Sequence, residues 1–154
     1  HTMLPLPKKR LIILDSMIDF DTSKQIILFD GVCNLCDKSV QYIIKNDKKD
    51  IFRFVAQQSP LGKELITYIG IQTAKVDSII LYIPNKAYFV QYDAVLHIAK
   101  QLNTYYYLLW IGSFFPNFIK NGLYNIIATY RYKWFGKKEV CMMPNLEIKS
   151  KFLE

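Results

Sequence analysis

The sequence predicts an α/β fold in one domain, and three observations carry this prediction. Short apolar runs alternate with segments whose apolar residues recur at helical spacing, which gives the order βαβαββα. A Cys-x-x-Cys stands where the first strand-like run meets the first helix-like run. The chain has 154 residues, of which 51% are apolar, so it can build a single core and is not intrinsically disordered.

The first strand is predicted over Ile26 to Phe29, four apolar residues that end at the turn-forming pair Asp30-Gly31. The first helix is predicted over residues 34–45. Its apolar stripe is formed by Cys36, Val40, Ile43 and Ile44. The two cysteines, Cys33 and Cys36, are therefore expected to open this helix.

A polar loop over residues 46–50 leads to a second predicted strand, Ile51 to Val55, which completes a βαβ unit. The second helix has clear start and stop signals. Ser59 is a favourable N-cap, Pro60 suits the first helical position, and Gly70 is a typical stop. These signals predict a helix between the second and third strands.

Two further strands are predicted over Ser78 to Ile83 and Ala87 to Gln91, with a hairpin turn at residues 84–86. Asp93 is then expected to cap a helix that runs to about Leu102. This helix completes the βαβαββα core.

The chain continues beyond that core into a helical C-terminal extension, within about residues 103–135, and a tail. One helix is predicted from Thr104 to Phe114, and another from Pro116, as a first-turn proline, to about Tyr132. We assign residues 25–154 to a single domain that includes this extension. Residues 1–24 are expected to be a tag remnant, since His1-Thr2 precedes Met3, followed by a leader segment.

The Cys-x-x-Cys pair predicts a redox-active dithiol. Backbone N–H groups and the dipole at a helix N-terminus favour a thiolate, so Cys33 is expected to be the nucleophile. Cys36, expected about one turn deeper, could then resolve a mixed disulfide formed at Cys33. A zinc site is an alternative, with Cys141, His97 and His1 as the remaining candidate ligands, and inert buried thiols are another. His97 is otherwise assigned no function.

The βαβαββα order with a dithiol at the start of its first helix is the thioredoxin/glutaredoxin arrangement. The sequence also carries short motifs along most of its length: Asp30-Gly31-x-Cys33-x-x-Cys36, Arg53-Phe54, Tyr92-Asp93-Ala94, Tyr130-Arg131-Tyr132-x-Trp134-Phe135-Gly136-Lys137 and Cys141-x-x-Pro144. With these motifs, the chain resembles the DCC family of thiol-disulfide oxidoreductase-like proteins. The resemblance implies a thioredoxin-like fold and disulfide oxidoreductase activity at Cys33 and Cys36, with Asp30 as the third motif residue.

One position departs from ordinary thioredoxins, which carry a cis-proline before the third strand. Asp77 is expected at this place. Because a cis peptide without proline costs about 2.5 to 4 kcal/mol, we expect a trans Val76–Asp77 bond and a differently shaped substrate groove. If Asp77 faces the dithiol, its charge would raise the pKa of Cys33.

Asp30 is a candidate catalytic residue with the two cysteines, and Arg131, Arg53 and Cys141 join Asp77 as candidates for auxiliary roles. Asp30 could cap the first helix or accept a proton from the resolving thiol. Arg131 could pair with a distant carboxylate such as Asp30 or bind an anionic substrate group, and an arginine beside the dithiol would stabilise its thiolate. Arg53 could do the same from the second strand. Cys141 could be a third redox thiol, although packing in the tail is the favoured interpretation.

The C-terminal half carries most of the net charge of +7, since no acidic residue occurs from Ala94 to Lys138. Many aromatic residues are interleaved with its basic ones. Such a surface could contact anionic lipid, nucleic acid or an acidic partner. The favoured interpretation is that most of these rings belong to the core, and no nucleic-acid partner is expected because no basic run is dense enough.

The sequence therefore predicts a thiol-disulfide oxidoreductase that needs no metal or organic cofactor. Its expected partners are a disulfide-containing protein or small thiol substrate and an external reductant such as glutathione or a thioredoxin-type system. A cytoplasmic location is expected, because the chain has few cysteines and residues 11–14 are too short for a signal peptide. The alternative is a binding or membrane-peripheral module on a thioredoxin-like scaffold.

Overall fold

The computed structural model describes residues 23–71, 79–84, 86–102, 110–112, 114–136 and 151–152. Asp77 and Cys141, with the predictions made for them, lie outside these residues. So do the tag remnant and most of the helix predicted from Thr104 to Phe114, of which the structure describes residues 110–112, which are helical, and Phe114, which lies in a turn.

The order of helices and strands confirms the predicted βαβαββα core. The structure contains β1 (Gln25–Phe29), α2 (Asn34–Asn46), β2 (Phe52–Ala56), α3 (Pro60–Ile69), β3 (Ile80–Ile83), β4 (Ala87–Val90), α4 (Gln91–Leu102) and α6 (Asn117–Phe135). Each predicted strand lies within one residue or two of its observed position.

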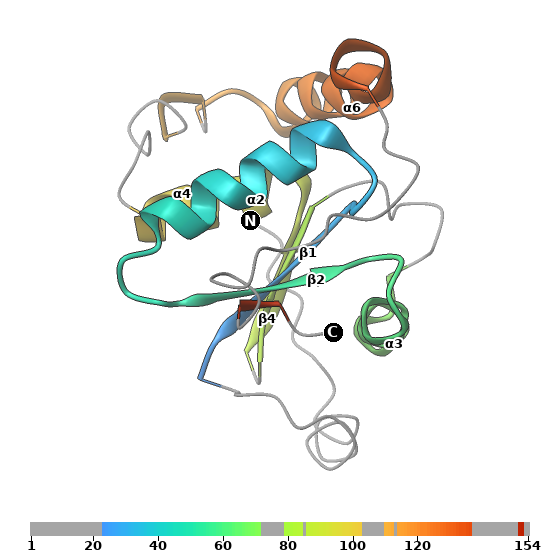
Figure 1. Cartoon of the computed structure of the whole chain (residues 1–154). Coiled ribbons are helices and arrows are strands. Elements are labelled where there is room, and N and C mark those ends of the chain that lie inside the picture. The colour runs from blue at the N-terminus through green and yellow to red at the C-terminus, as the bar shows by residue number, and fades with distance from the viewer. Residues whose placement is uncertain are drawn as a thin grey trace.

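The strands form one four-stranded sheet in the order β2-β1-β3-β4. Strands β1 and β2 are parallel, whereas β3 runs antiparallel to both of its neighbours, β1 and β4. Helices α2, α4 and α6 lie on one side of this sheet, and α3 lies on the other (Figure 1). This is a thioredoxin-like α/β fold with a helical C-terminal region.

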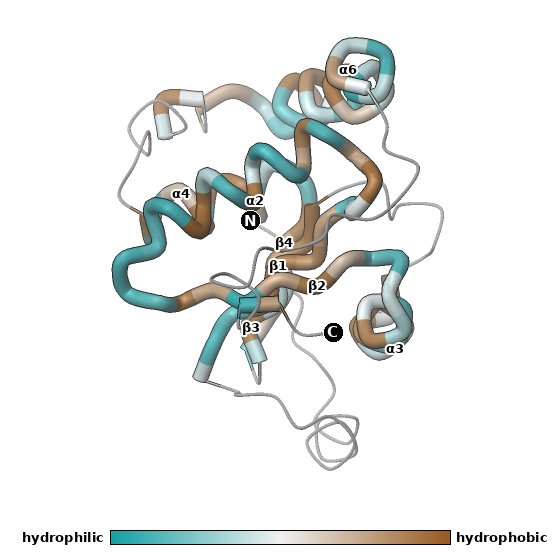
Figure 2. Tube along the Cα trace, in the orientation of Figure 1, coloured by the Kyte–Doolittle hydropathy of each residue, from teal (hydrophilic) through white to brown (hydrophobic). Residues whose placement is uncertain are grey.

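Two apolar clusters form the core, one on each face of the sheet. Because strand residues alternate between faces, Ile27 and Phe29 of β1 join the cluster beneath α2 and α4, while Ile26 and Leu28 join the cluster beneath α3. Figure 2 shows the strands as the hydrophobic centre of the molecule. The sheet is thus buried on both faces. The dithiol follows the end of β1 and lies at the start of α2.

The signals that predicted α3 act as expected. The Ser59 hydroxyl accepts a hydrogen bond from the Gly62 N–H at 3.0 Å, and Gly70 ends the helix with φ of 82°. Gly62 also permits close packing, since a Cβ atom there would lie 2.1 Å from the Ala56 carbonyl oxygen. The turn from β2 into α3 is therefore fixed by local sequence.

Two predicted helix starts were wrong. Helix α4 begins at Gln91, directly after β4, so Asp93 lies in the first turn rather than at the N-cap. The Gln91 N–H instead donates to the Ile79 carbonyl at 3.1 Å, a contact across the sheet that local sequence does not reveal. Pro116 is the N-cap residue of α6 rather than a first-turn proline, and this helix continues to Phe135.

The interpretation that most C-terminal rings are core is also wrong for the described residues. Helix α6 turns residues 120, 124, 128 and 131 toward α2 and α4, and Lys120 and Arg131 among them are buried. Many of its large apolar side chains are therefore exposed, among them Ile119, Leu123 and Ile126. The exposed aromatic side chains of this region are Trp110, Phe114, Phe115, Phe118, Tyr130, Trp134 and Phe135.

None of the described helices is long and apolar enough to cross a membrane.

Candidate active site

The dithiol lies at the start of α2, as predicted. Cys33 is the N-cap residue of this helix and Cys36 is in its first turn, and both are free thiols. The expected difference in depth is reversed, however, because Cys33 is 0% exposed while Cys36 is partly exposed. Helical spacing gives the relative directions of the two side chains, but the neighbouring elements decide which sulfur reaches solvent.

The C-terminal end of α6 is one of those neighbouring elements. The Asn34 side-chain amide donates to the Phe135 carbonyl at 2.8 Å, and the Asn34 backbone N–H lies 3.5 Å from the Gly136 carbonyl. The C-terminal end of α6 is therefore hydrogen-bonded to Asn34, the residue that follows Cys33. This contact places the C-terminal extension directly at the dithiol.

A buried ion pair lies beside the cysteines. Arg131 Nη2 donates to Asp30 Oδ2 at 2.9 Å, and both side chains are 5% exposed. The predicted pairing of Arg131 with Asp30 is thus confirmed. Arg131 Nη1 also lies 4.0 Å from Cys36 Sγ, so the guanidinium bridges the carboxylate and the dithiol.

Asp30 accepts four hydrogen bonds. Its Oδ1 accepts from the Val32 N–H at 3.1 Å and from Gln58 Nε2 at 2.7 Å, while its Oδ2 accepts from Arg131 and from the Tyr132 hydroxyl. The helix-cap interpretation is wrong, because the N-cap residue of α2 is Cys33 and this helix has no side-chain cap. Four donors also fill the acceptor sites of a carboxylate, which fits a residue that positions Arg131 better than a proton acceptor.

The environment of Cys36 keeps this thiol protonated. Burial is the largest reason that its pKa rises from 9.0 to about 12, and the charge of a Cys33 thiolate and a hydrogen bond to the Cys33 sulfur act in the same direction. Arg131 opposes these effects, since its positive charge lowers the pKa of Cys36. The Cys36 thiol therefore retains its proton at neutral pH.

Tyr132 belongs to the same cluster. Burial and then its hydrogen bond to Asp30 raise the pKa of the Tyr132 hydroxyl to about 12. The hydroxyl also accepts from Arg131 Nη2 at 3.1 Å. The Tyr132 hydroxyl thus stays neutral, and it is hydrogen-bonded to both Asp30 and Arg131.

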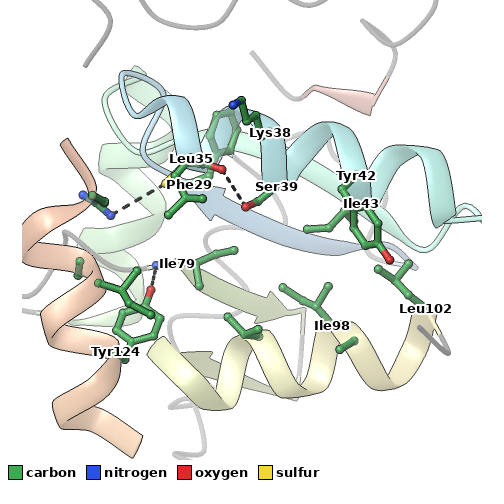
Figure 3. A pocket seen from close by; sticks show the side chains of 16 residues that line it. Phe29, Leu35, Lys38, Ser39, Tyr42, Ile43, Ile79, Ile98, Leu102 and Tyr124 are labelled. Atoms are coloured by element: carbon green, nitrogen blue, oxygen red, sulfur yellow. Dashed lines mark hydrogen bonds between the residues drawn. The ribbon is translucent and has the colours of Figure 1, made fainter. Parts of the chain in front are cut away.

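A cavity of about 450 Å³ opens next to the dithiol, between α2, α4 and α6 (Figure 3). Cys36 and Arg131 line it, and most of its other lining side chains are apolar. Its volume lies within the range of small-molecule sites, about 300 to 1,000 Å³. The dithiol therefore adjoins a space that could receive part of a substrate.

The family model of the DCC1-like thiol-disulfide oxidoreductases matches residues 27–137, which include the dithiol and the arginine beside it. The chain belongs to this family. The family resemblance inferred from the motifs is thus confirmed. The region matched ends just after α6, so this helix is part of the family pattern and not an appendage.

Two relatives show how far the similarity extends along this DCC1-like protein. The uncharacterized protein YuxK of Bacillus subtilis is 38% identical over 136 residues, covering 86% of this chain and 98% of that protein. A DCC family protein of Arabidopsis thaliana, described as chloroplastic, is 34% identical over 122 residues, covering 79% of this chain and 70% of that protein. No solved structure matches the chain.

Arg53 does not lie beside the dithiol. It binds Asp50 with Nη1 to Oδ1 at 2.8 Å, and hydrogen bonds from Arg53 and Lys151 hold the pKa of Asp50 below its ordinary value. The reason is topological, because β1 and β2 are parallel and Arg53 pairs with Ile26 at the start of β1, whereas the dithiol follows its end.

The sequence-based interpretation missed three residues of the DCC1-like site: Gln58, Tyr132 and Asn34. Tyr132 was visible only as the neighbour of Arg131, and Gln58 only as a polar residue after the second strand. Their partners, Asp30 and the end of α6, become adjacent only through packing. His97 lies on α4 and stacks on Phe89 with ring centroids 3.8 Å apart.

Among the residues that the structure describes, no group of three or more His, Cys, Asp or Glu side chains could hold a metal ion.

Proposed function

We propose that this member of the DCC1-like thiol-disulfide oxidoreductases exchanges disulfides through Cys33 and Cys36. One observation carries the proposal: a buried Asp30–Arg131 ion pair places a guanidinium 4.0 Å from the Cys36 sulfur, whose thiol is hydrogen-bonded to Cys33. A fixed positive charge beside a thiol pair favours thiolate chemistry. The substrate would be a disulfide-containing protein or a small disulfide.

In the reducing direction, the Cys33 thiolate attacks a substrate disulfide, forming a mixed disulfide and releasing one substrate thiolate, which takes up a proton. The Cys36 thiol then loses its proton and attacks the Cys33 sulfur. This step releases the second substrate thiolate and leaves a Cys33–Cys36 disulfide. Two electrons pass from the dithiol to the substrate.

The mixed disulfide would itself activate Cys36. Four causes raise the pKa of this thiol, and two of them, the charge on Cys33 and the hydrogen bond to its sulfur, depend on a free Cys33 thiolate. Both disappear when Cys33 is bonded to substrate, whereas Arg131 continues to favour the Cys36 thiolate. The resolving thiol therefore ionises more readily after the first step than before it.

Equilibration in a series of glutathione redox buffers, followed by rapid alkylation and mass spectrometry, tests this proposal. We expect a reversible two-electron Cys33–Cys36 couple between about −120 and −300 mV. A pair that never closes would overturn the proposal, as would thiols that become alkylatable only after chelation. Regeneration of the dithiol would use an external reductant such as glutathione or a thioredoxin-type system, which the cytoplasm would supply.

A second candidate function is peripheral membrane binding, and the outward apolar face of α6 favours it. Phe118 and Trp134 are 75% and 58% exposed, and Leu123 and Ile126 are exposed between them. Interfacial helices bury aromatic and aliphatic side chains at the boundary between headgroups and acyl chains. Because Lys120 and Arg131 are buried, apolar insertion would contribute more than attraction to anionic lipid.

Sedimentation with vesicles of phosphatidylcholine and phosphatidylglycerol tests this candidate. Binding is expected to persist at high salt and in Cys33→Ser, and to fall at least tenfold in Phe118→Ser/Leu123→Ser, since each buried apolar side chain contributes about 1.5 to 3 kcal/mol. Failure to sediment with vesicles at low salt would contradict the membrane interpretation.

A further inference from the structure

We propose that the cavity beside Cys36 binds the apolar arm of a small-molecule disulfide, so that the substrates include disulfides with an alkyl-like group on one sulfur. This inference rests on the proposed function and names a substrate class for the same dithiol.

The cavity begins at the dithiol and follows α2 away from it. Cys36 and Arg131, which lie 4.0 Å apart, are among its lining residues. Tyr42, Ile43 and Leu102 lie together at one end of the cavity (Figure 3). Seven residues separate Cys36 from Ile43 along the helix, which corresponds to about 10 Å at 1.5 Å per residue. An apolar group on a substrate sulfur that lies next to Cys36 in the mixed disulfide with Cys33 could therefore extend along the cavity for about that distance.

The walls of the cavity are chemically suited to a hydrocarbon. Its aliphatic and aromatic side chains come from β1, α2, α4 and α6, and they include Phe29, Leu35, Val95, Ile98 and Ile127. Burial of apolar surface against such walls contributes about 0.8 kcal/mol for each methylene group. Affinity for an apolar arm would thus grow with its length until the cavity is filled.

The same walls are unsuited to a peptide backbone. The Ser39 hydroxyl donates to the Leu35 carbonyl at 2.8 Å, and the Tyr124 hydroxyl accepts from the Ile79 N–H at 3.0 Å (Figure 3). Of the three hydroxyl-bearing residues that line the cavity, Ser39 and Tyr124 are thus engaged with the protein's own backbone, and the third is Tyr42. An extended peptide would bury N–H and C=O groups with few partners here, which is costly, whereas an alkyl arm has no such groups.

The charges around the cavity also favour an uncharged arm. In the part of the chain that the structure describes, no acidic side chain lines it, so these residues offer a cationic arm no partner. Its cationic residues are Lys38, which is exposed, and Arg131, which is paired with Asp30. An anionic arm would therefore lose its hydration without gaining an uncommitted buried cation.

The chemical step is the exchange described above, and the apolar arm stays bonded to the protein in the mixed disulfide until the second step. The Cys33 thiolate bonds to the sulfur that carries the arm, and the other half of the substrate leaves as a thiolate and is protonated. Cys36 then displaces the arm as a thiolate, which takes up the proton that Cys36 has lost. Both electrons needed to cleave the substrate disulfide come from the protein dithiol.

The test is the rate at which the reduced protein is oxidised by alkyl 2-hydroxyethyl disulfides whose alkyl group is ethyl, butyl or hexyl. Each rate is divided by the rate at which dithiothreitol reduces the same disulfide, which corrects for differences in the intrinsic reactivity of the disulfides. We expect the corrected rate constant to rise about fourfold per methylene, or about 15-fold from ethyl to butyl. Val95→Phe on α4 and Ala128→Phe on α6 each place a ring at the cavity wall and should abolish this dependence.

Bis(2-hydroxyethyl) disulfide has no apolar arm, so its rate in each protein is the reference against which the rates of that protein with the alkyl disulfides are compared. Thr129→Phe is the matched control, because this position lies on α6 beside Ala128 but is exposed. It should keep the full chain-length dependence. A flat dependence in the wild type, with normal oxidation by bis(2-hydroxyethyl) disulfide, would overturn the inference alone, whereas no oxidation by any disulfide would overturn the proposed function.

Discussion

Replacing Cys36 by serine is expected to stop turnover and to trap the protein as a mixed disulfide. Without a resolving thiol, Cys33 can still attack a substrate, but nothing within the pair can displace the product. We expect multiple-turnover disulfide reduction to fall at least about 1,000-fold, as happens when a catalytic group is removed. Mass spectrometry after incubation with a small disulfide should show one adduct, located at Cys33.

Cys33→Ser should lose turnover to the same extent but accumulate little adduct, because the Cys36 thiol retains its proton at neutral pH. Cys141→Ser is the matched control, since it removes the remaining cysteine of the chain. If Cys141 only packs, this variant keeps normal turnover. An adduct that forms in Cys33→Ser instead of Cys36→Ser would show that the more exposed sulfur attacks first and would reverse the proposed roles.

Replacing Arg131 by methionine is expected to have the largest effect on stability. The substitution leaves the Asp30 carboxylate 5% exposed and without its cation. Breaking a buried ion pair by removing one partner costs about 3 to 5 kcal/mol. Urea denaturation should therefore show a decrease of about that size in the free energy of unfolding.

Asp30→Asn in the Arg131→Met background should recover much of this loss, because the uncompensated charge is removed with it. The double variant would then be more stable than the sum of the two single effects predicts. Arg53→Met serves as the control, since its partner Asp50 is half exposed and such pairs contribute at most about 1 kcal/mol. Equal losses in Arg131→Met and Arg53→Met would contradict the structural role assigned to the buried pair.

Much of the fold was predictable because its signals are local. Ser59, Pro60 and Gly70 fix the ends of α3 through hydrogen bonds and backbone angles within a few residues of each position. The strands are short apolar runs, and the dithiol follows directly from one of them. Such features depend on neighbours in sequence, so they can be recognised before the tertiary structure is known.

The outward face of α6 was not predictable in the same way. Apolar periodicity indicates which residues share a helix face, and the usual expectation is that the apolar face is buried. In α6 the inward face instead carries Lys120, Tyr124 and Arg131. Lys120 lies over the Tyr92 ring at 5.4 Å, and Arg131 pairs with Asp30. The interaction partners of Lys120 and Arg131, which lie on other parts of the chain, thus make the polar face of α6 the buried one.

The sequence by itself determined the order of the elements, the position of Cys33 and Cys36 at a helix start, and the family. Only the tertiary structure decided which groups surround the dithiol. Arg131 is 95 residues from Cys36 and 101 from Asp30, and Tyr132 is 102 from Asp30. Such contacts arise from the packing of α6 against α2 and α4, and local propensity does not encode the relative position of helices so far apart in the chain.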